Sequence, residues 1–100
     1  MANTSITLFR GAAATSNTTL YTSPANVAVS VNNIAITNTA TTAATATINL
    51  ATVALVSSLS IPANSTQFID CEQIIYNTET ITGSASATTV NFHIAGFEVY

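Results

Sequence analysis

The sequence predicts an all-β protein, an antiparallel β-sandwich of the jelly-roll or immunoglobulin-like type with about seven strands. Thr, Val and Ile are abundant, whereas helix formers such as Leu, Glu, Lys, Gln and Arg are scarce, and β-branched side chains fit a pleated sheet better than a helix. Apolar residues recur at every second position in several short, closely spaced segments. We expect one sandwich domain at positions 18–100, preceded by an N-terminal arm at positions 1–17.

The N-terminal arm has small side chains and weak periodicity. Apart from Met1, its only large apolar residues are Ile6, Leu8 and Phe9, and Arg10 follows them directly. Free strands and extended segments are natural sites for pairing with another chain. We therefore predict that these four residues contact a neighbouring subunit.

The first predicted strands show the alternation of a sheet with one buried face. A short strand is expected at 18–22, followed by a longer one at 27–39. In the longer strand one alternating apolar series ends at Val31, and a second series of opposite parity continues to Ile36. A parity change inside a strand indicates a β-bulge, here at Asn32-Asn33.

The later segments repeat this pattern at the spacing of a sandwich. Val90, Phe92 and Ile94 form the clearest inward set, and Gly96 separates them from further apolar residues of the other parity, which predicts a second bulge. The complete set of predicted strands is 18–22, 27–39, 43–50, 53–60, 66–76, 80–87 and 89–100.

The charge content argues against several classes of partner. Only 5% of the residues are charged, far below the roughly 25% of an ordinary soluble domain, and the net charge is −3. Nucleic-acid binding needs several Lys or Arg side chains, and Arg10 is the only one here, so we expect no nucleic-acid partner. No apolar stretch is long enough to span a membrane. We therefore expect that the protein does not have a membrane as a partner. A surface of Thr, Ser and Asn instead suits close packing between copies.

The groups that would support catalysis are few. His93 is expected on the exposed face of its strand, with a role as ligand or pH sensor as the alternative. Cys71 lies between Asp70 and Glu72, whose charges oppose thiolate formation. No spacing typical of a calcium loop is present. We therefore expect no enzymatic activity, no metal and no cofactor. The carboxylates considered as metal ligands are Asp70, Glu72, Glu79 and Glu98.

The order of turns and strands from about Thr19 to Val99 resembles that of small bacteriophage virion proteins. The segments that carry the resemblance are 20–24 (LYTSP), 36–39 (ITNT), 60–66 (SIPANST), 79–81 (ETI) and 83–87 (GSASA). The resemblance implies a capsid decoration or cement protein, or a module of the tail or baseplate. Cement proteins of this kind often form homotrimers over joints between capsomers.

These considerations lead to one functional expectation and one alternative. We expect a virion structural protein, assembled in the host cytoplasm, that associates with itself as a homotrimer and bridges subunits of the major capsid protein. The alternative is a tail or baseplate module that recognises a glycan or a host surface. Its candidate sugar platforms are Tyr21, Tyr76 and Tyr100.

Overall fold

A computed structural model describes residues 3–99, and the side chains of residues 6–99. Within those residues there is no helix, and therefore none that could cross a membrane. They form eight strands instead of the seven expected. The strands are β1 (Asn3–Ala12), β2 (Thr18–Thr22), β3 (Ala28–Asn38), β4 (Ala44–Leu50), β5 (Val53–Ile61), β6 (Ser65–Tyr76), β7 (Thr80–Ala85) and β8 (Val90–Val99).

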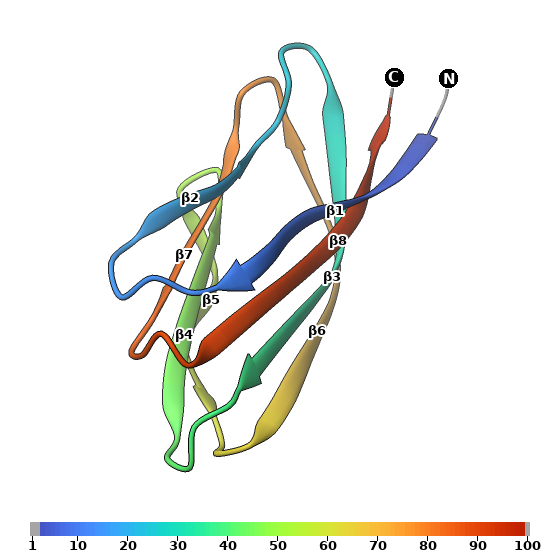
Figure 1. Ribbon diagram of the computed structural model, residues 1–100. Helices are drawn as coiled ribbons and strands as arrows, with labels where there is room; N and C mark the ends of the chain where they lie inside the picture. The colour runs from blue at the N-terminus through green and yellow to red at the C-terminus, as the bar shows by residue number, and fades with distance from the viewer. Residues whose placement is uncertain (1–2, 100) are drawn as a thin grey trace.

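The strands form two antiparallel sheets packed face to face, which confirms the predicted β-sandwich (Figure 1). Sheet A has the strand order β1-β8-β3-β6, and sheet B has the order β2-β7-β4-β5. The chain passes from one sheet to the other at every connection except the β4–β5 hairpin. This order of eight strands is that of a jelly roll and not of an immunoglobulin domain.

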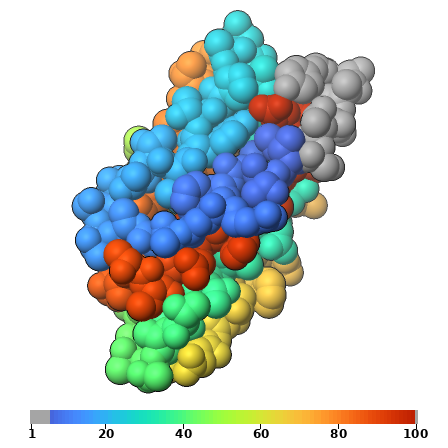
Figure 2. All heavy atoms as spheres, viewed as in Figure 1, coloured from blue at the N-terminus to red at the C-terminus, as the bar shows by residue number. Residues whose placement is uncertain are grey.

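The N-terminal segment belongs to the sandwich, which corrects the predicted arm at positions 1–17. Residues 3–12 form β1, which pairs with β8 from Asn3 opposite Val99 to Ala12 opposite Asn91. Figure 2 shows the atoms of β1 packed against those of β8. The register shifts between Thr7 and Phe9, so a bulge interrupts the alternation that would have revealed this strand in the sequence.

The core lies between the two sheets and is built from alternate residues of each strand. Along β3 and β4 buried side chains alternate with more exposed ones, except at the bulge of β3, and the positions between the buried residues are occupied by polar side chains or Ala. Phe92 is the only aromatic side chain that is fully buried in the described part of the chain, so small and β-branched residues fill most of the core. The other fully buried large apolar residues are Ile34, Ile36, Ile48, Ile61, Ile75, Ile81, Ile94, Val29, Val31 and Val90.

A line of register shifts crosses sheet A. The bulge predicted at Asn32-Asn33 is confirmed, because β3 shifts register against both neighbours between Val31 and Asn33. The second bulge predicted at Gly96 is wrong, since β8 keeps its alternation there and the extra residues lie in β1 and β3. Gly96 is instead a point of close approach, where a Cβ atom would lie 1.9 Å from the carbonyl oxygen of Ser30.

The β4–β5 hairpin turns through two residues that carry side chains. Leu50 pairs with Val53, and the two residues between them, Ala51 and Thr52, have φ angles of 50° and 66°. Two positive φ angles in a two-residue loop define a type I′ turn, which usually contains Gly or Asn. The chain forms this turn without either residue, at a cost in backbone strain.

Two buried polar residues close the ends of the sandwich. Asn38, fully buried at the end of β3, donates from Nδ2 to the carbonyl oxygens of Thr42 and Ile61, and its Oδ1 accepts from the Ala40 N–H and the Thr89 hydroxyl. At the opposite end Ser23 donates from its hydroxyl to the Val27 carbonyl at 2.7 Å. Every buried side-chain nitrogen or oxygen in the described residues has a partner.

We predict that Leu8→Ala lowers the free energy of unfolding by about 3 kcal/mol, because it leaves a cavity in the core. Leu8 is only 6% exposed. Thr7→Ala on the same strand is the control and should change stability by less than about 0.5 kcal/mol, since Thr7 is exposed. Urea unfolding measures both. Equal effects of the two substitutions would contradict the placement of β1 in the sheet.

We also predict that Gly96→Ala destabilises the protein by about 3 kcal/mol or more, since the added methyl group meets backbone that cannot move aside. Gly11→Ala is the matched control, because the nearest atom to its new Cβ is a side-chain carbon of Phe9 at 3.4 Å. Thermal unfolding of the two variants distinguishes the effects. A Gly96→Ala protein as stable as the Gly11→Ala protein would show that β3 and β8 are further apart than described.

Candidate interaction surface

The outer faces of the two sheets differ in chemistry. The outer face of sheet B carries hydroxyl and amide groups, and none of its described residues is ionisable. Asn49 on β4 donates to the Thr82 hydroxyl of β7 within this polar layer. The outward residues that define this face are Thr19, Thr45, Thr47, Asn49, Ser60, Thr80, Thr82 and Ser84.

The outer face of sheet A carries charged and large apolar side chains together. One row across the sheet runs from Arg10 on β1 through His93 and Ala35 to Phe68 on β6. The next row brings Asp70 onto the β6 edge, where its carboxylate accepts a hydrogen bond from the Asn33 amide at 3.1 Å. Positive and negative side chains therefore lie at opposite edges of one face.

The edge strand β6 concentrates the exposed apolar groups of this face. Its outward side chains alternate along the strand, and both Phe68 and Ile74 are 69% exposed. Asp70 and Glu72 separate these two, so the order along the strand is apolar, acidic, apolar. We call this set the outer stripe of β6. It consists of Thr66, Phe68, Asp70, Glu72, Ile74 and Tyr76.

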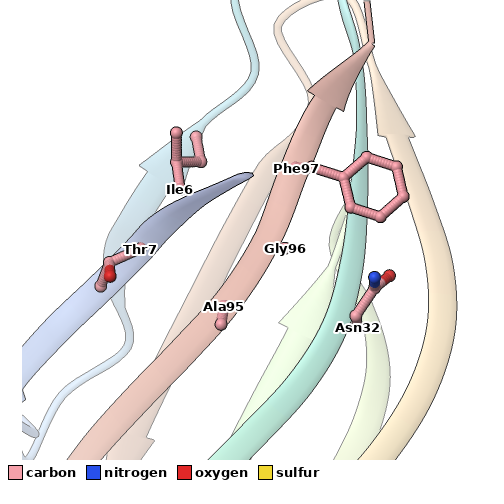
Figure 3. A pocket seen from close by; sticks show the side chains of 6 residues that line it. All are labelled: Ile6, Thr7, Asn32, Ala95, Gly96 and Phe97. Carbon is pink, nitrogen blue, oxygen red and sulfur yellow. The ribbon is translucent and has the colours of Figure 1, made fainter. Parts of the chain in front are cut away.

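A shallow hollow of about 430 Å³ lies in the middle of sheet A, at the line of register shifts (Figure 3). Ile6 and Thr7 of β1 line one side, and Asn32 of β3 with the Phe97 ring lines the other. Its floor contains Ala95 and Gly96 of β8. Because the strand alternation continues through Gly96, Phe97 points to the outer face and not into the core.

The structure separates the four residues predicted as an interface. Leu8 lies in the core, so its assignment to an exposed arm is wrong. Ile6 and Phe9 are half-buried and pack against the core, although Ile6 also borders the hollow. Arg10 is exposed on the outer face. Contact of Ile6, Phe9 and Arg10 with a neighbour stays a prediction.

The three tyrosines considered as sugar platforms also differ. Tyr76 is 49% exposed in the outer stripe of β6. Tyr21 of β2 is half-buried and donates from its hydroxyl to Glu98 Oε2 of β8 at 2.9 Å, which joins the two sheets. Tyr100 lies outside the described residues.

The residues considered for catalysis or metal binding do not come together. Among the described residues no three of His, Cys, Asp and Glu form a group that could hold a metal ion. His93 is exposed on β8, while Cys71 is half-buried on β6 and donates from Sγ to the Val31 carbonyl oxygen at 3.3 Å. Burial raises the pKa of the Cys71 thiol, Asp70 raises it further, and the Gln73 backbone partly offsets both. Burial is therefore a larger cause of the raised pKa than the neighbouring charge that the sequence had pointed to.

No protein-family model matches the chain, and a search of curated proteins finds no match to it. The properties of its surface therefore carry the functional argument.

Sequence reasoning did not identify the outer stripe of β6. A signal was present, because apolar residues occur there on both parities, with Ile69 and Ile75 on one and Phe68 and Ile74 on the other. Apolar residues on both faces of an edge strand leave one set exposed. Recognising this required knowing that β6 is an edge strand, which only the sheet order reveals.

We predict that the raised pKa of Cys71 makes stability depend on pH in the alkaline range. A thiol whose pKa is raised on folding contributes stability below its ordinary value of 9.0, and the contribution is lost as pH rises through the folded value. Wild-type protein should therefore lose stability relative to Cys71→Ala between pH 8 and 11, as measured by urea unfolding. A difference between the two proteins that is constant with pH would contradict the burial of this thiol.

Proposed function

We propose that this protein is a virion structural protein, a capsid decoration or cement protein without enzymatic activity. In this proposal it associates with copies of itself, as a homotrimer, and bridges neighbouring subunits of the major capsid protein. The observation that carries the proposal is the outer stripe of β6, where two side chains that are each 69% exposed lie on a long edge strand. Exposed apolar groups on an edge strand are typical of a surface that another protein covers.

The mechanism that we propose is non-covalent. The jelly-roll core holds sheet A as a rigid platform, and the outer stripe docks on the capsid through its apolar residues at Phe68 and Ile74. Jelly rolls occur in viral capsid proteins and also in lectins, so the fold alone does not decide between these functions. The resemblance of segments 20–24 and 60–66 to phage virion proteins supports the first of them.

The mass of the purified protein tests the proposal most directly. Light scattering should give a mass of three chains, about 31 kDa from the 10.3 kDa of one chain, and the assembly should co-sediment with capsid particles. A monomer that does not bind particles would overturn the proposed function. A monomer that binds particles would contradict the proposed self-association but support the proposed docking on the capsid.

A tail or baseplate module that recognises a glycan is the second candidate. The observation that favours it is the exposure of Tyr76, since an exposed aromatic ring is a common platform for sugars. Binding of the assembled protein to a glycan array, abolished by Tyr76→Ala, would support this candidate over capsid docking.

We predict that the double substitution Phe68→Ser, Ile74→Ser weakens binding to capsid particles by about 30-fold or more, because both apolar contacts are lost. Val53→Ser is the matched control, since Val53 is also 69% exposed but lies on β5 of sheet B. Co-sedimentation at increasing particle concentration gives both dissociation constants. Equal weakening by the control, or none by the double variant, would remove the stripe from the docking surface.

A further inference from the structure

Sheet A ends in two long strands whose outer edges have no strand beside them in the described part of the chain. β1 pairs only with β8, and β6 pairs only with β3. The two edges have 10 and 12 residues, so each offers backbone N–H and C=O groups over a similar length. Such an edge is a template for another strand.

The charges of β6 oppose pairing between two copies of the same edge. If β6 paired antiparallel with β6 of a second copy so that Phe68 met Ile74, then Asp70 would lie opposite Glu72 of the second copy. Like charges directly opposite each other destabilise a strand pair. The same geometry would repeat this repulsion on the other side of the symmetry axis.

Pairing between different edges brings opposite charges together. Within sheet A each strand is antiparallel to the next, so β6 is antiparallel to β1. When β6 of one copy lies beside β1 of the next in a continuous sheet, the new pair keeps this antiparallel sense. Arg10 of β1 then faces the acidic centre of the outer stripe.

This contact cannot form inside one chain. Arg10 and Asp70 lie on strands separated by β8 and β3, and three strand spacings place them about 14 Å apart. Arg10 is also the only Lys or Arg in the sequence, so no other Lys or Arg of a second copy can serve. A side-chain ion pair between copies that uses Lys or Arg must therefore use Arg10.

One register satisfies the charges and keeps the outer faces aligned. With Arg10 opposite Asp70, Ala12 lies opposite Phe68. The extra residue of β1 between Thr7 and Phe9 then brings Thr7 opposite Glu72. Exposed residues thus face exposed residues on both sides of the β1 bulge.

We propose that β1 of one copy pairs antiparallel with β6 of a neighbouring copy, with Arg10 opposite Asp70, so that sheet A continues from one subunit into the next. This inference rests on the self-association in the proposed function and specifies its contact. A contact between two different edges closes into a ring or extends as a filament. A ring of three subunits agrees with the proposed trimer.

Reversal of the two charges tests the pair in the full-length protein. Arg10→Asp and Asp70→Arg should each raise the dissociation constant of the assembly at least about tenfold, because each places like charges opposite each other. The combination Arg10→Asp, Asp70→Arg should return to within about threefold of wild type. Thr19→Arg, on the outer face of sheet B, is the control and should leave the assembly intact. Single variants that assemble like wild type, or a double variant without rescue, would overturn the pairing.

A disulfide test reports the register independently of affinity. In a Cys71→Ser background, Ala12→Cys and Phe68→Cys in one chain should form oxidised multimers linked between subunits. Directly opposite residues have Cα atoms about 4.5–5.5 Å apart, within the range of a disulfide. Inside one chain these positions lie at opposite edges of sheet A.

The controls separate failure of this contact from failure of the proposed function. Phe68→Cys alone should give no linked dimer, whereas efficient dimer formation would show that two β6 edges meet and would overturn the β1–β6 pairing. An assembly of wild-type mass in which the paired cysteines do not link would overturn the pairing and keep self-association. A monomeric wild-type protein would overturn both the β1–β6 pairing and the proposed self-association.

Discussion

The buried amide of Asn38 is the interaction on which the closed end of the sandwich depends. Its four hydrogen bonds connect the end of β3, the following loop, the end of β5 and the residue before β8. Because β3 lies in sheet A and β5 in sheet B, one side chain clamps both sheets. A core with a single fully buried aromatic ring buries limited apolar area and gains limited stability from it. The fully satisfied hydrogen bonds of Asn38 therefore contribute a larger share of the stability. Ser23 occupies the corresponding place at the opposite end.

The clamped sandwich determines which surface is presented to a partner. The register of the strand pairs in sheet A fixes the order of side chains across its outer face. That order places Arg10 at one edge and Asp70 at the other, with exposed apolar groups beside the acidic centre. A rigid arrangement of this kind loses little conformational entropy when a partner covers it.

The sequence predicted the fold well where alternation was regular and failed where a bulge or a missing side chain altered it. The strands after residue 17 agree with the structure to within two residues, because Val, Ile and Thr alternate clearly in most of them. β1 was missed because the bulge at Leu8 places Leu8 and Phe9 on the core side in succession. The interpretation of Gly96 was wrong because its Cβ is excluded by Ser30 of another strand, which is a tertiary constraint. The outer stripe escaped detection for a related reason, since strand order is not encoded in local periodicity.

The absence of ionisable groups from the described outer face of sheet B has a consequence for any assembly that buries sheet A. Such an assembly turns a layer of Thr, Ser and Asn toward the solvent. The hydration of hydroxyl and amide groups does not depend on proton uptake, and this face has no charged side chain of its own for salt to screen. A particle coated in this way would meet changes of acidity and ionic strength with an unaltered exterior, while the contacts that respond to them lie sheltered beneath.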